Sequence, residues 1–137
     1  MRSAEALERF RSARVARLAT ITPEGHPHIV PVTFAAEDGR AFTMVDHKPK
    51  TTRHLQRLIN IEAEPRVALL VDHYNDDWER LWWVRVDGTA AVHDRDEVWQ
   101  HGRQLLEAKY PQYRGRPPEG QAIVVGITRV ASWESTP

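Results

Sequence analysis

The sequence predicts a mainly β, α+β protein built as a small closed or split β-barrel. Three observations predict this fold class. About six runs of strand-type residues follow one another, mostly joined by short hairpin turns, and one helical segment separates the third run from the fourth. No G-x-G-x-x-G fingerprint is present, which argues against a doubly wound dinucleotide-binding sheet. A chain of 137 residues fits one compact domain, so we expect a single domain over residues 1–137.

The first part of the chain predicts one helix followed by three strands. Ser3 is a candidate N-cap for a helix over 3–13, which has Leu7 and Phe10 on one face. Runs of apolar residues bounded by turn signals predict strands over 14–22, 26–37 and 40–46. Pro27 and Pro31 lack backbone donors, so the second strand is expected at a sheet edge or a bulge. Asp38-Gly39 is a hairpin turn between the second and third strands.

The rest of the chain predicts two helices and three more strands. The helices are expected over 50–59 and 94–110, and the strands over 66–74, 81–93 and 121–134. Asp94 or Asp96 caps the longer helix, whose apolar side carries Val98, Leu105 and Leu106. Gly88 marks a bulge in the long strand. Residues 75–80 and 111–120 are predicted to be loops.

The long strand over 81–93 has two different faces. Alternate residues of a strand point to the same side of the sheet. Trp82, Val84 and Val86 are therefore expected to fill the barrel, whereas Trp83, Arg85 and Asp87 share the outer face. Tryptophan and arginine are enriched in interfaces, which predicts a dimer contact or the wall of a groove. The alternative is a tryptophan that covers one end of the barrel.

Composition excludes several functions. Nineteen Lys and Arg balance nineteen Asp and Glu, so the chain lacks the basic excess of a general nucleic-acid binder. Cysteine is absent, which excludes disulfides, zinc thiolates and cysteine nucleophiles. No run is long and apolar enough for a membrane span, and no secretory signal is recognisable, so a cytoplasmic protein is expected. His26 and His28 could share a strand face, but no H-E-x-x-H or compact ligand triad exists, and no metal site is expected.

The junction between the third strand and the helix after it carries an unusual group of basic and hydroxyl residues. Lys48, Lys50, Thr51, Thr52 and Arg53 lie at the predicted helix start, and Arg57 follows Arg53 by one turn. Cations at a helix N-terminus oppose the helix dipole, and a bound anion reverses that effect. The pattern therefore indicates a phosphate site, with a solvated basic helix start as the alternative. The extended segment 42–46 before it is suited to holding a planar ring that carries the phosphate.

Several segments resemble one protein family, in order and spacing as well as in composition. The stretches "ATITPEGHPHIVPV", "AFTMVDHKPKTTRHLQRL", "EPRVALLVD" and "WWVRVDGTAAV" are similar to the FMN-binding-like split-barrel superfamily related to pyridoxamine 5′-phosphate oxidase. More narrowly, "DHKPK", "LVDHYNDDW" and "LWWVRVDG" resemble the actinobacterial branch that uses the deazaflavin coenzyme F420. One departure is Trp83-Val84-Arg85, where pyridoxamine phosphate oxidases often have Gln-Val-Arg with the glutamine on the flavin.

The resemblance implies a homodimer with two equivalent cofactor grooves at the subunit interface. The phosphate would lie on Lys48, Lys50, Thr51 and Arg53, and Arg57 would meet the anionic tail. The ring would lie along Pro31, Val32, Thr33, Met44, Val45 and Asp46, with His47 beside it. The second subunit would close the groove with Trp78, Trp83 or Trp133.

The function expected from this resemblance is that of an F420-dependent oxidoreductase, which transfers a hydride between the reduced deazaflavin and a small organic acceptor. The cofactor is F420, with FMN as the alternative. Other possibilities stay open at this point: an FMN- or haem-binding barrel of oxidase or haem-degrading type, a non-catalytic F420 carrier, and a purely structural dimer. The sequence identifies no catalytic residue and no substrate.

Overall fold

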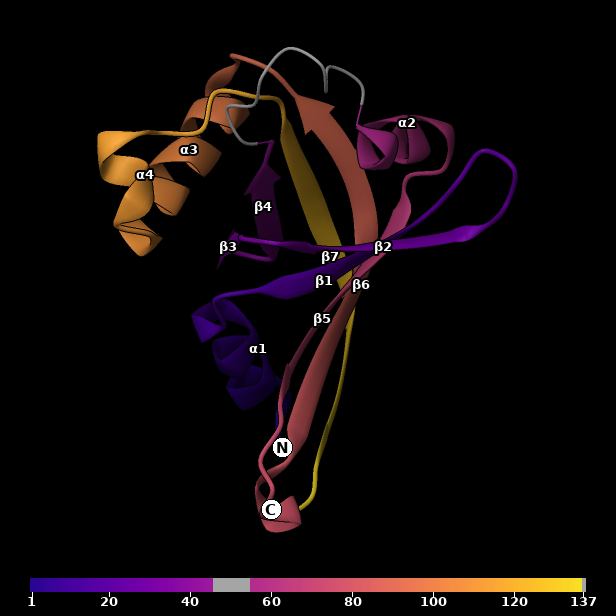
Figure 1. Ribbon diagram of the computed structural model, residues 1–137, viewed down its shortest axis with the longest axis vertical. Coiled ribbons are helices and arrows are strands. Elements are labelled where there is room, and N and C mark those ends of the chain that lie inside the picture. Colours follow the sequence, from indigo (N-terminus) through magenta and orange to yellow (C-terminus); the bar gives the residue numbers. More distant parts are fainter. Residues whose placement is uncertain (46–54, 137) are drawn as a thin grey trace.

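A computed structural model describes residues 1–45 and 55–136 of the chain (Figure 1). In these residues seven strands form one antiparallel sheet in the order β2-β1-β5-β6-β7-β4-β3. The strands are β1 (Ala16–Ile21), β2 (Pro27–Val32), β3 (Ala35–Glu37), β4 (Arg40–Met44), β5 (Arg66–His73), β6 (Trp82–His93) and β7 (Ala122–Glu134). The helices are α1 (Ser3–Ser12), α2 (Gln56–Ala63), η2 (Trp78–Arg80), α3 (Glu97–Lys109) and α4 (Gln112–Gly115). The predicted fold class is confirmed.

The turns and the bulge follow the sequence closely. Asp38 and Gly39 both have positive φ, 52° and 77°, as a tight hairpin turn between β3 and β4 requires. The pairing of β6 with β7 shifts register between Asp87 and Gly88, which confirms the predicted bulge. A Cβ atom at Gly88 would lie 2.3 Å from the carbonyl oxygen of Gly126, so only glycine allows the two strands to approach this closely.

The predicted strand over 26–37 is wrong as a single element, because it is interrupted after Val32. The backbone of Phe34 bonds to a side chain instead of to a strand: its N–H donates to the hydroxyl of Tyr110 at 3.1 Å, and its carbonyl accepts from the same hydroxyl at 3.0 Å. β2 and β3 are therefore separate strands at opposite ends of the sheet order. The edge position predicted for the proline-containing strand is confirmed for β2.

The helix starts differ from the predictions in two places. Ser3 is the first residue of α1 and not its cap, since Arg2 occupies the cap position without a side-chain hydrogen bond. α2 begins at Gln56, because Leu55 before it has extended backbone, and the helix runs past the predicted end to Ala63. Lys50, the predicted start, lies outside the described residues. The structure decides between Asp94 and Asp96 as the cap of α3. Asp96 is the N-cap, and its side chain accepts from the N–H of Trp99 at 2.8 Å.

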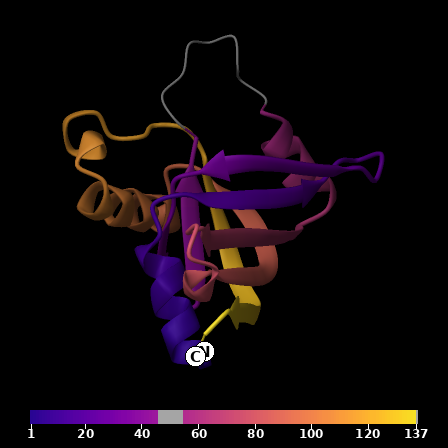
Figure 2. The same ribbon diagram turned by 60° about the horizontal axis from the view of Figure 1, so that its bottom comes forward.

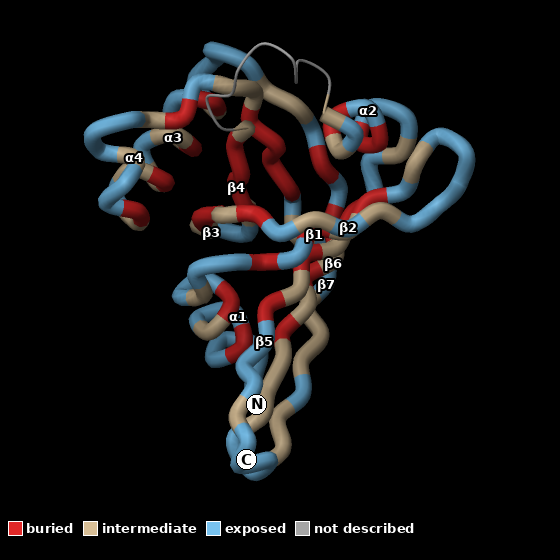
Figure 3. The backbone as a smooth tube through the Cα atoms, in the orientation of Figure 1, coloured by how far each residue is buried: buried red, intermediate tan, exposed pale blue. Residues whose placement is uncertain are grey.

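The buried apolar residues form two hydrophobic clusters. Figure 3 marks in red where buried residues lie along the backbone. The larger one occupies the barrel and includes Leu18, Val84 and Val86, while Trp82 packs against it partly buried, as predicted for that face of β6. The smaller one lies between α3 and β4, where Phe42 and Leu106 are fully buried. A Cβ atom at Gly102 would lie 2.8 Å from the Phe42 ring, so α3 packs tightly on the sheet.

The two chain ends lie side by side at one end of the barrel (Figures 1 and 2). The amino group of Met1 lies 2.9 Å from the carboxylate of Glu134. Among the described residues, no helix combines the length and the apolar character that crossing a membrane requires. Two of the predicted loops contain short helical turns, η2 at the tip between β5 and β6 and α4 before β7.

Candidate cofactor groove

A groove of about 540 Å³ lies between the end of β2 and the end of β4. β2 and the residue after it contribute Pro31, Val32 and Thr33, and β4 and the residue after it contribute Thr43, Met44 and Val45. Leu55 and Arg57 from the start of α2, Val15 from before β1, and Tyr113 from α4 complete the lining. We call it the β2–β4 groove. Its floor is apolar and anchored in the core, because Val32 and Met44 are both buried.

Backbone hydrogen bonds fix the wall formed by Val45. Its N–H donates to the carbonyl of Gln121 at 3.0 Å, and its own carbonyl accepts from the N–H of Gly120 at 3.1 Å. A Cβ atom at Gly120 would lie 2.6 Å from both the carbonyl oxygen and the Cβ of Val45. Glycine at this position thus allows the segment before β7 to hold Val45 in place.

The structure brings together six of the residues that the sequence singles out. They are Pro31, Val32, Thr33, Met44, Val45 and Arg57, and all of them line the β2–β4 groove. Asp46, His47, Lys48, Lys50, Thr51 and Arg53 lie outside the described residues. Trp78 and Trp83 do not line the β2–β4 groove of their own chain. Trp78 is in η2 with 69% of its surface exposed, and Trp83 lies on the outer face of β6.

Sequence reasoning missed Tyr113, which stands in the predicted loop 111–120. Its hydroxyl lies 2.8 Å from the hydroxyl of Thr33, and its ring meets the Tyr110 ring edge to face with the centroids 5.7 Å apart. The sequence signal for this contact was that Tyr110 and Tyr113 are three positions apart, which places them on one face of a helical turn. The proline- and glycine-rich composition around them concealed that turn.

A second cavity of about 610 Å³ adjoins the β2–β4 groove. It shares Val15, Thr33 and Tyr113 with the groove, and its other lining residues are Arg14, Tyr110, Pro111 and Gln112. We call it the tyrosine pocket. The hydroxyl pair of Thr33 and Tyr113 thus stands where the two spaces meet.

Lys109 and Tyr110, at the end of α3, hold the back of the tyrosine pocket in place. The Lys109 ammonium donates to the carbonyls of Arg11, Ala13 and Phe34 at 2.9, 2.7 and 2.9 Å. Burial lowers the pKa of Lys109 to about 8. Burial also raises the pKa of Tyr110, whose hydroxyl bonds to the carbonyls of Arg14 and Phe34. These bonds tie α1, the connection between α1 and β1, and the connection between β2 and β3 to the end of α3.

The outer face of the sheet carries a third cavity, of about 620 Å³, next to exposed apolar side chains. Trp83 lines this cavity and pairs across the strands with Trp133, which is 45% exposed. Ile29 on β2 is 63% exposed and lines the same cavity. Two ion pairs lie on this face: Arg17 with Asp72 at 3.3 Å, and Arg85 with Asp87 at 2.9 Å.

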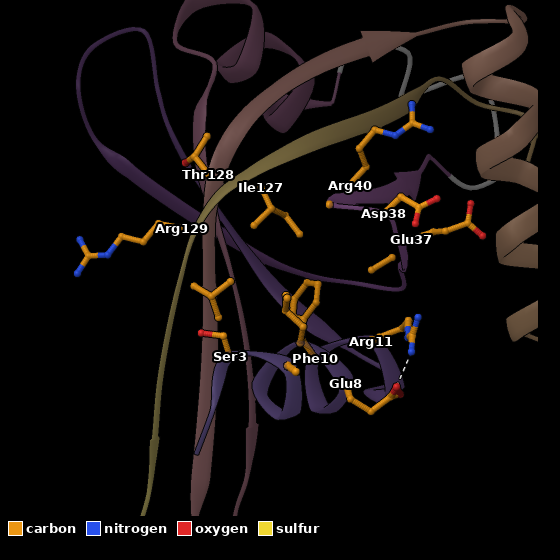
Figure 4. A pocket seen from close by; sticks show the side chains of 15 residues that line it. Ser3, Glu8, Phe10, Arg11, Glu37, Asp38, Arg40, Ile127, Thr128 and Arg129 are labelled. Atoms are coloured by element: carbon orange, nitrogen blue, oxygen red, sulfur yellow. Dashed lines mark hydrogen bonds and ion pairs between the residues drawn. The ribbon is translucent and has the colours of Figure 1, made fainter.

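A fourth cavity, of about 590 Å³, lies between α1, the β3–β4 hairpin and β7 (Figure 4). We call it the α1 pocket. Leu7, Phe10 and Ile127 form its apolar surface. Its charges have both signs, and Glu8 and Arg11 form an ion pair across one turn of α1. In the described part of the chain, no three His, Asp or Glu residues gather so that they could hold a metal ion.

The fold and the sequence together assign a family. A family model described as pyridoxamine 5′-phosphate oxidase matches residues 3–134, nearly the whole chain. The chain therefore belongs to the pyridoxamine 5′-phosphate oxidase family, a family of split-barrel proteins. No curated protein matches the chain.

Solved structures extend the comparison. A conserved hypothetical protein from Mycobacterium tuberculosis is 24% identical with a TM-score of 0.79, over 98% of this chain and 86% of that one. An FAD-binding protein from Mesorhizobium loti is 19% identical with a TM-score of 0.74, over 96% and 94%. The haem storage protein HutZ from Vibrio cholerae is 18% identical with a TM-score of 0.71, over 98% and 95%. At identities this low, the likeness shows a shared fold only.

Proposed function

We propose that the protein is an F420-dependent oxidoreductase of this family, which holds the deazaflavin in the β2–β4 groove and transfers a hydride to a small organic acceptor. The observation that carries the proposal is the convergence of six predicted contact residues on one apolar groove. Those residues come from separate parts of the sequence, and a groove of about 540 Å³ is of the size that small-molecule sites have.

The residues of the groove fit a flat, anionic cofactor. Val32, Met44 and Val45 offer an apolar surface for one face of a ring. Arg57 lies in the first turn of α2, which contains no acidic residue, so both the helix dipole and the side chain favour an anion there. Lys48, Lys50, Thr51 and Arg53 are proposed for the phosphate, and Asp46 and His47 for the rim beside the ring. These six residues lie outside the described part of the chain.

The chemistry divides between cofactor and protein. Reduced F420, when bound, supplies a hydride, which carries two electrons and one proton to an electrophilic carbon of the acceptor. A proton from water completes the reduced product. The protein's own part is to bind the cofactor, orient its reactive face toward the acceptor, and keep water out of the groove with Val32, Met44 and Val45.

The proposal includes a homodimer formed through the outer face of the sheet. Ile29, Trp83 and Trp133 place apolar side chains on this face. Two ion pairs lie among them, so covering the face would leave those four charges partnered. Trp78, at the exposed tip between β5 and β6, is proposed to reach the groove of the second subunit.

FMN is a second candidate for the same groove. The apolar floor and the cationic helix start suit the ring and phosphate of FMN as well as those of F420. Trp83 stands at the position where pyridoxamine phosphate oxidases often use a flavin-contacting glutamine, and this difference favours F420.

The experiment that tests the proposal is an equilibrium titration of the same apo protein with F420, FMN and haem, followed by fluorescence or absorbance. We expect saturable binding of F420, tighter than that of FMN or haem. Light scattering on the same preparation is expected to give the mass of a dimer of the 15.8 kDa chain. Tight binding of haem or FMN with none of F420 would contradict the proposal, and F420 binding without turnover on any acceptor would identify a carrier.

A further inference from the structure

The helix that carries Arg57 has little stability of its own. α2 has eight residues, and Leu55 at its N-cap makes no side-chain hydrogen bond to the helix. Isolated helices of this length are marginal in water, so packing against the rest of the protein holds α2 in place. Because Arg57 lines the β2–β4 groove, its position there depends on whatever fixes the rotation of α2 on the barrel.

A buried polar pair joins α2 to the barrel from inside the core. Among the described residues, the buried ones with polar or charged side chains are Thr20, Thr43 and Asn60. Two of them are bonded to each other: the side-chain amide of Asn60, on α2, donates to the hydroxyl of Thr20, on β1, at 2.9 Å. Asn60 is 0% exposed and Thr20 is 2% exposed, so water cannot take over this bond if it is lost.

The buried amide of Asn60 is bonded through both its nitrogen and its oxygen. The oxygen accepts from the side-chain amide of Gln56 at 2.7 Å, one turn earlier in α2. A chain of hydrogen bonds therefore runs from Gln56 through Asn60 to Thr20. A fully bonded polar network in a core is rigid, because each broken bond leaves a buried group without a partner. The apolar contacts of Leu58 and Ile61 with the same core are not directional.

Arg57 lies on the part of α2 that these hydrogen bonds fix. It follows Gln56 directly and precedes Asn60 by three positions, which makes Arg57 and Asn60 neighbours on the helix surface. Asn60 is buried in the core, while Arg57 lines the groove. A rotation of α2 that broke the bond between Asn60 and Thr20 would turn Arg57 as well.

We propose that Asn60 and Thr20 are positioning residues, which fix the rotation of α2 and thereby hold Arg57 where it meets the anionic part of the cofactor. The assignment rests on the proposed function, because it places a cofactor anion beside Arg57. Neither Asn60 nor Thr20 lines the β2–β4 groove, so each acts through Arg57 and not by contact with the cofactor.

The test removes the buried hydroxyl with the least change in shape. Thr20→Val deletes the acceptor and keeps a branched side chain, whereas Thr20→Ser keeps the acceptor. Thr128→Val is the matched control, because it removes a hydroxyl that bonds to the carbonyl of Asp87 at 3.2 Å and does not line the groove. Arg57→Met provides a background in which the positioned cation is absent. Equilibrium titration with F420 measures each variant and the double variant Thr20→Val/Arg57→Met, and thermal melts establish that each is folded.

We expect F420 binding to weaken about tenfold in Thr20→Val and to be unchanged in Thr20→Ser and Thr128→Val. Arg57→Met should also weaken binding, and adding Thr20→Val to it should weaken binding no further, since Thr20 acts through Arg57. Equal affinities of wild type and Thr20→Val would overturn the assignment. A loss from Thr20→Val that is as large in the Arg57→Met background as in the wild type would also overturn it.

Hydrogen exchange of the same apo samples separates this inference from the proposed function. The α2 amides should exchange about tenfold faster in Thr20→Val than in wild type or Thr20→Ser, while the α1 amides keep their rates. Absence of F420 binding to the wild type would refute the proposed function, and the exchange rates would still decide whether Thr20 fixes α2. Equal α2 exchange rates in wild type and Thr20→Val would overturn the positioning role.

Discussion

The β2–β4 groove and the α1 pocket are similar in size, about 540 and 590 Å³, yet they are built differently. In the α1 pocket several charged groups have partners within the protein: Glu8 pairs with Arg11, Glu37 bonds to His101 at 2.7 Å, and Arg40 lies over the Phe42 ring. In the groove, an apolar floor stands beside a helix start that contains a cation and no acid. Volume therefore does not distinguish a candidate site from a crevice. The difference lies in where the groove places its cation, in the first turn of a helix that has no acidic residue there.

The largest expected effect concerns the floor of the α1 pocket, which we interpret as structural. Phe10 is fully buried against Phe34, with the ring centroids 4.7 Å apart. Phe10→Ala should lower the free energy of unfolding by about 3–5 kcal/mol, because it leaves a cavity in the core. Leu7→Ala, at a 39% exposed position in the same pocket, should have a much smaller effect. Denaturant titration measures both. A lower F420 affinity of the folded protein in either variant would contradict the interpretation of the α1 pocket as purely structural.

The next prediction compares Gly120, beside the β2–β4 groove, with Gly88, near the α1 pocket. A Cβ at Gly120 would meet Val45 of the groove wall, and a Cβ at Gly88 would meet Gly126, which precedes the β7 wall of the α1 pocket. Each substitution to alanine should destabilise the fold by about 1–3 kcal/mol through overpacking. Only Gly120→Ala should also weaken F420 binding, since it displaces Val45. Gly115→Ala, with no atom within 4 Å of the new Cβ, is the control. Equal F420 affinities in Gly88→Ala and Gly120→Ala would contradict this.

The elements that the sequence predicted well are those whose local chemistry decides their structure. The Asp38-Gly39 turn, the Gly88 bulge and the Asp96 cap each depend on a single residue whose backbone or side chain has one favourable use. The inward face of β6 follows from simple alternation of apolar residues.

What the sequence could not predict depends on contacts between distant residues. The break between β2 and β3 results from hydrogen bonds of Phe34 to Tyr110, and nothing near Phe34 in the chain indicates them. Tyr113 belongs to the site for the same reason, because its partner Thr33 is remote in sequence. Six of the ten residues that line the groove were nevertheless predicted, and among them Pro31, Met44 and Arg57 lie in segments that carry the family resemblance.

A prediction on the cationic segment tests the groove against the α1 pocket directly. Lys50→Ala or Arg53→Ala should each weaken F420 binding by tenfold or more, about 1.4 kcal/mol, if these side chains hold the phosphate. Arg11→Ala removes an equal charge from the α1 pocket and should leave the affinity unchanged, since Arg11 is paired with Glu8. Titrations at low and moderate salt measure all three. Unchanged affinity in both Lys50→Ala and Arg53→Ala would refute the phosphate assignment while leaving the fold assignment intact.

The last prediction is a pH dependence that distinguishes the buried cation Lys109, behind the tyrosine pocket, from the exposed cation Arg11 of the α1 pocket. Burial lowers the pKa of Lys109 from 10.5 to about 8, so between these pH values the unfolded chain binds more protons at this site than the folded chain. The contribution of Lys109 to the free energy of unfolding therefore rises with pH across this window. The contribution of Tyr110 to the free energy of unfolding falls with pH above pH 10, because its raised pKa keeps the hydroxyl of the folded state protonated to higher pH.

Denaturant titrations of wild type and Lys109→Met from pH 7.5 to 9.5 avoid the range in which Tyr110 titrates. The wild type should gain stability relative to the variant as pH rises, whereas Arg11→Ala should track the wild type. A constant difference between wild type and Lys109→Met would show that Lys109 keeps its proton throughout, held by the three carbonyls of its clamp.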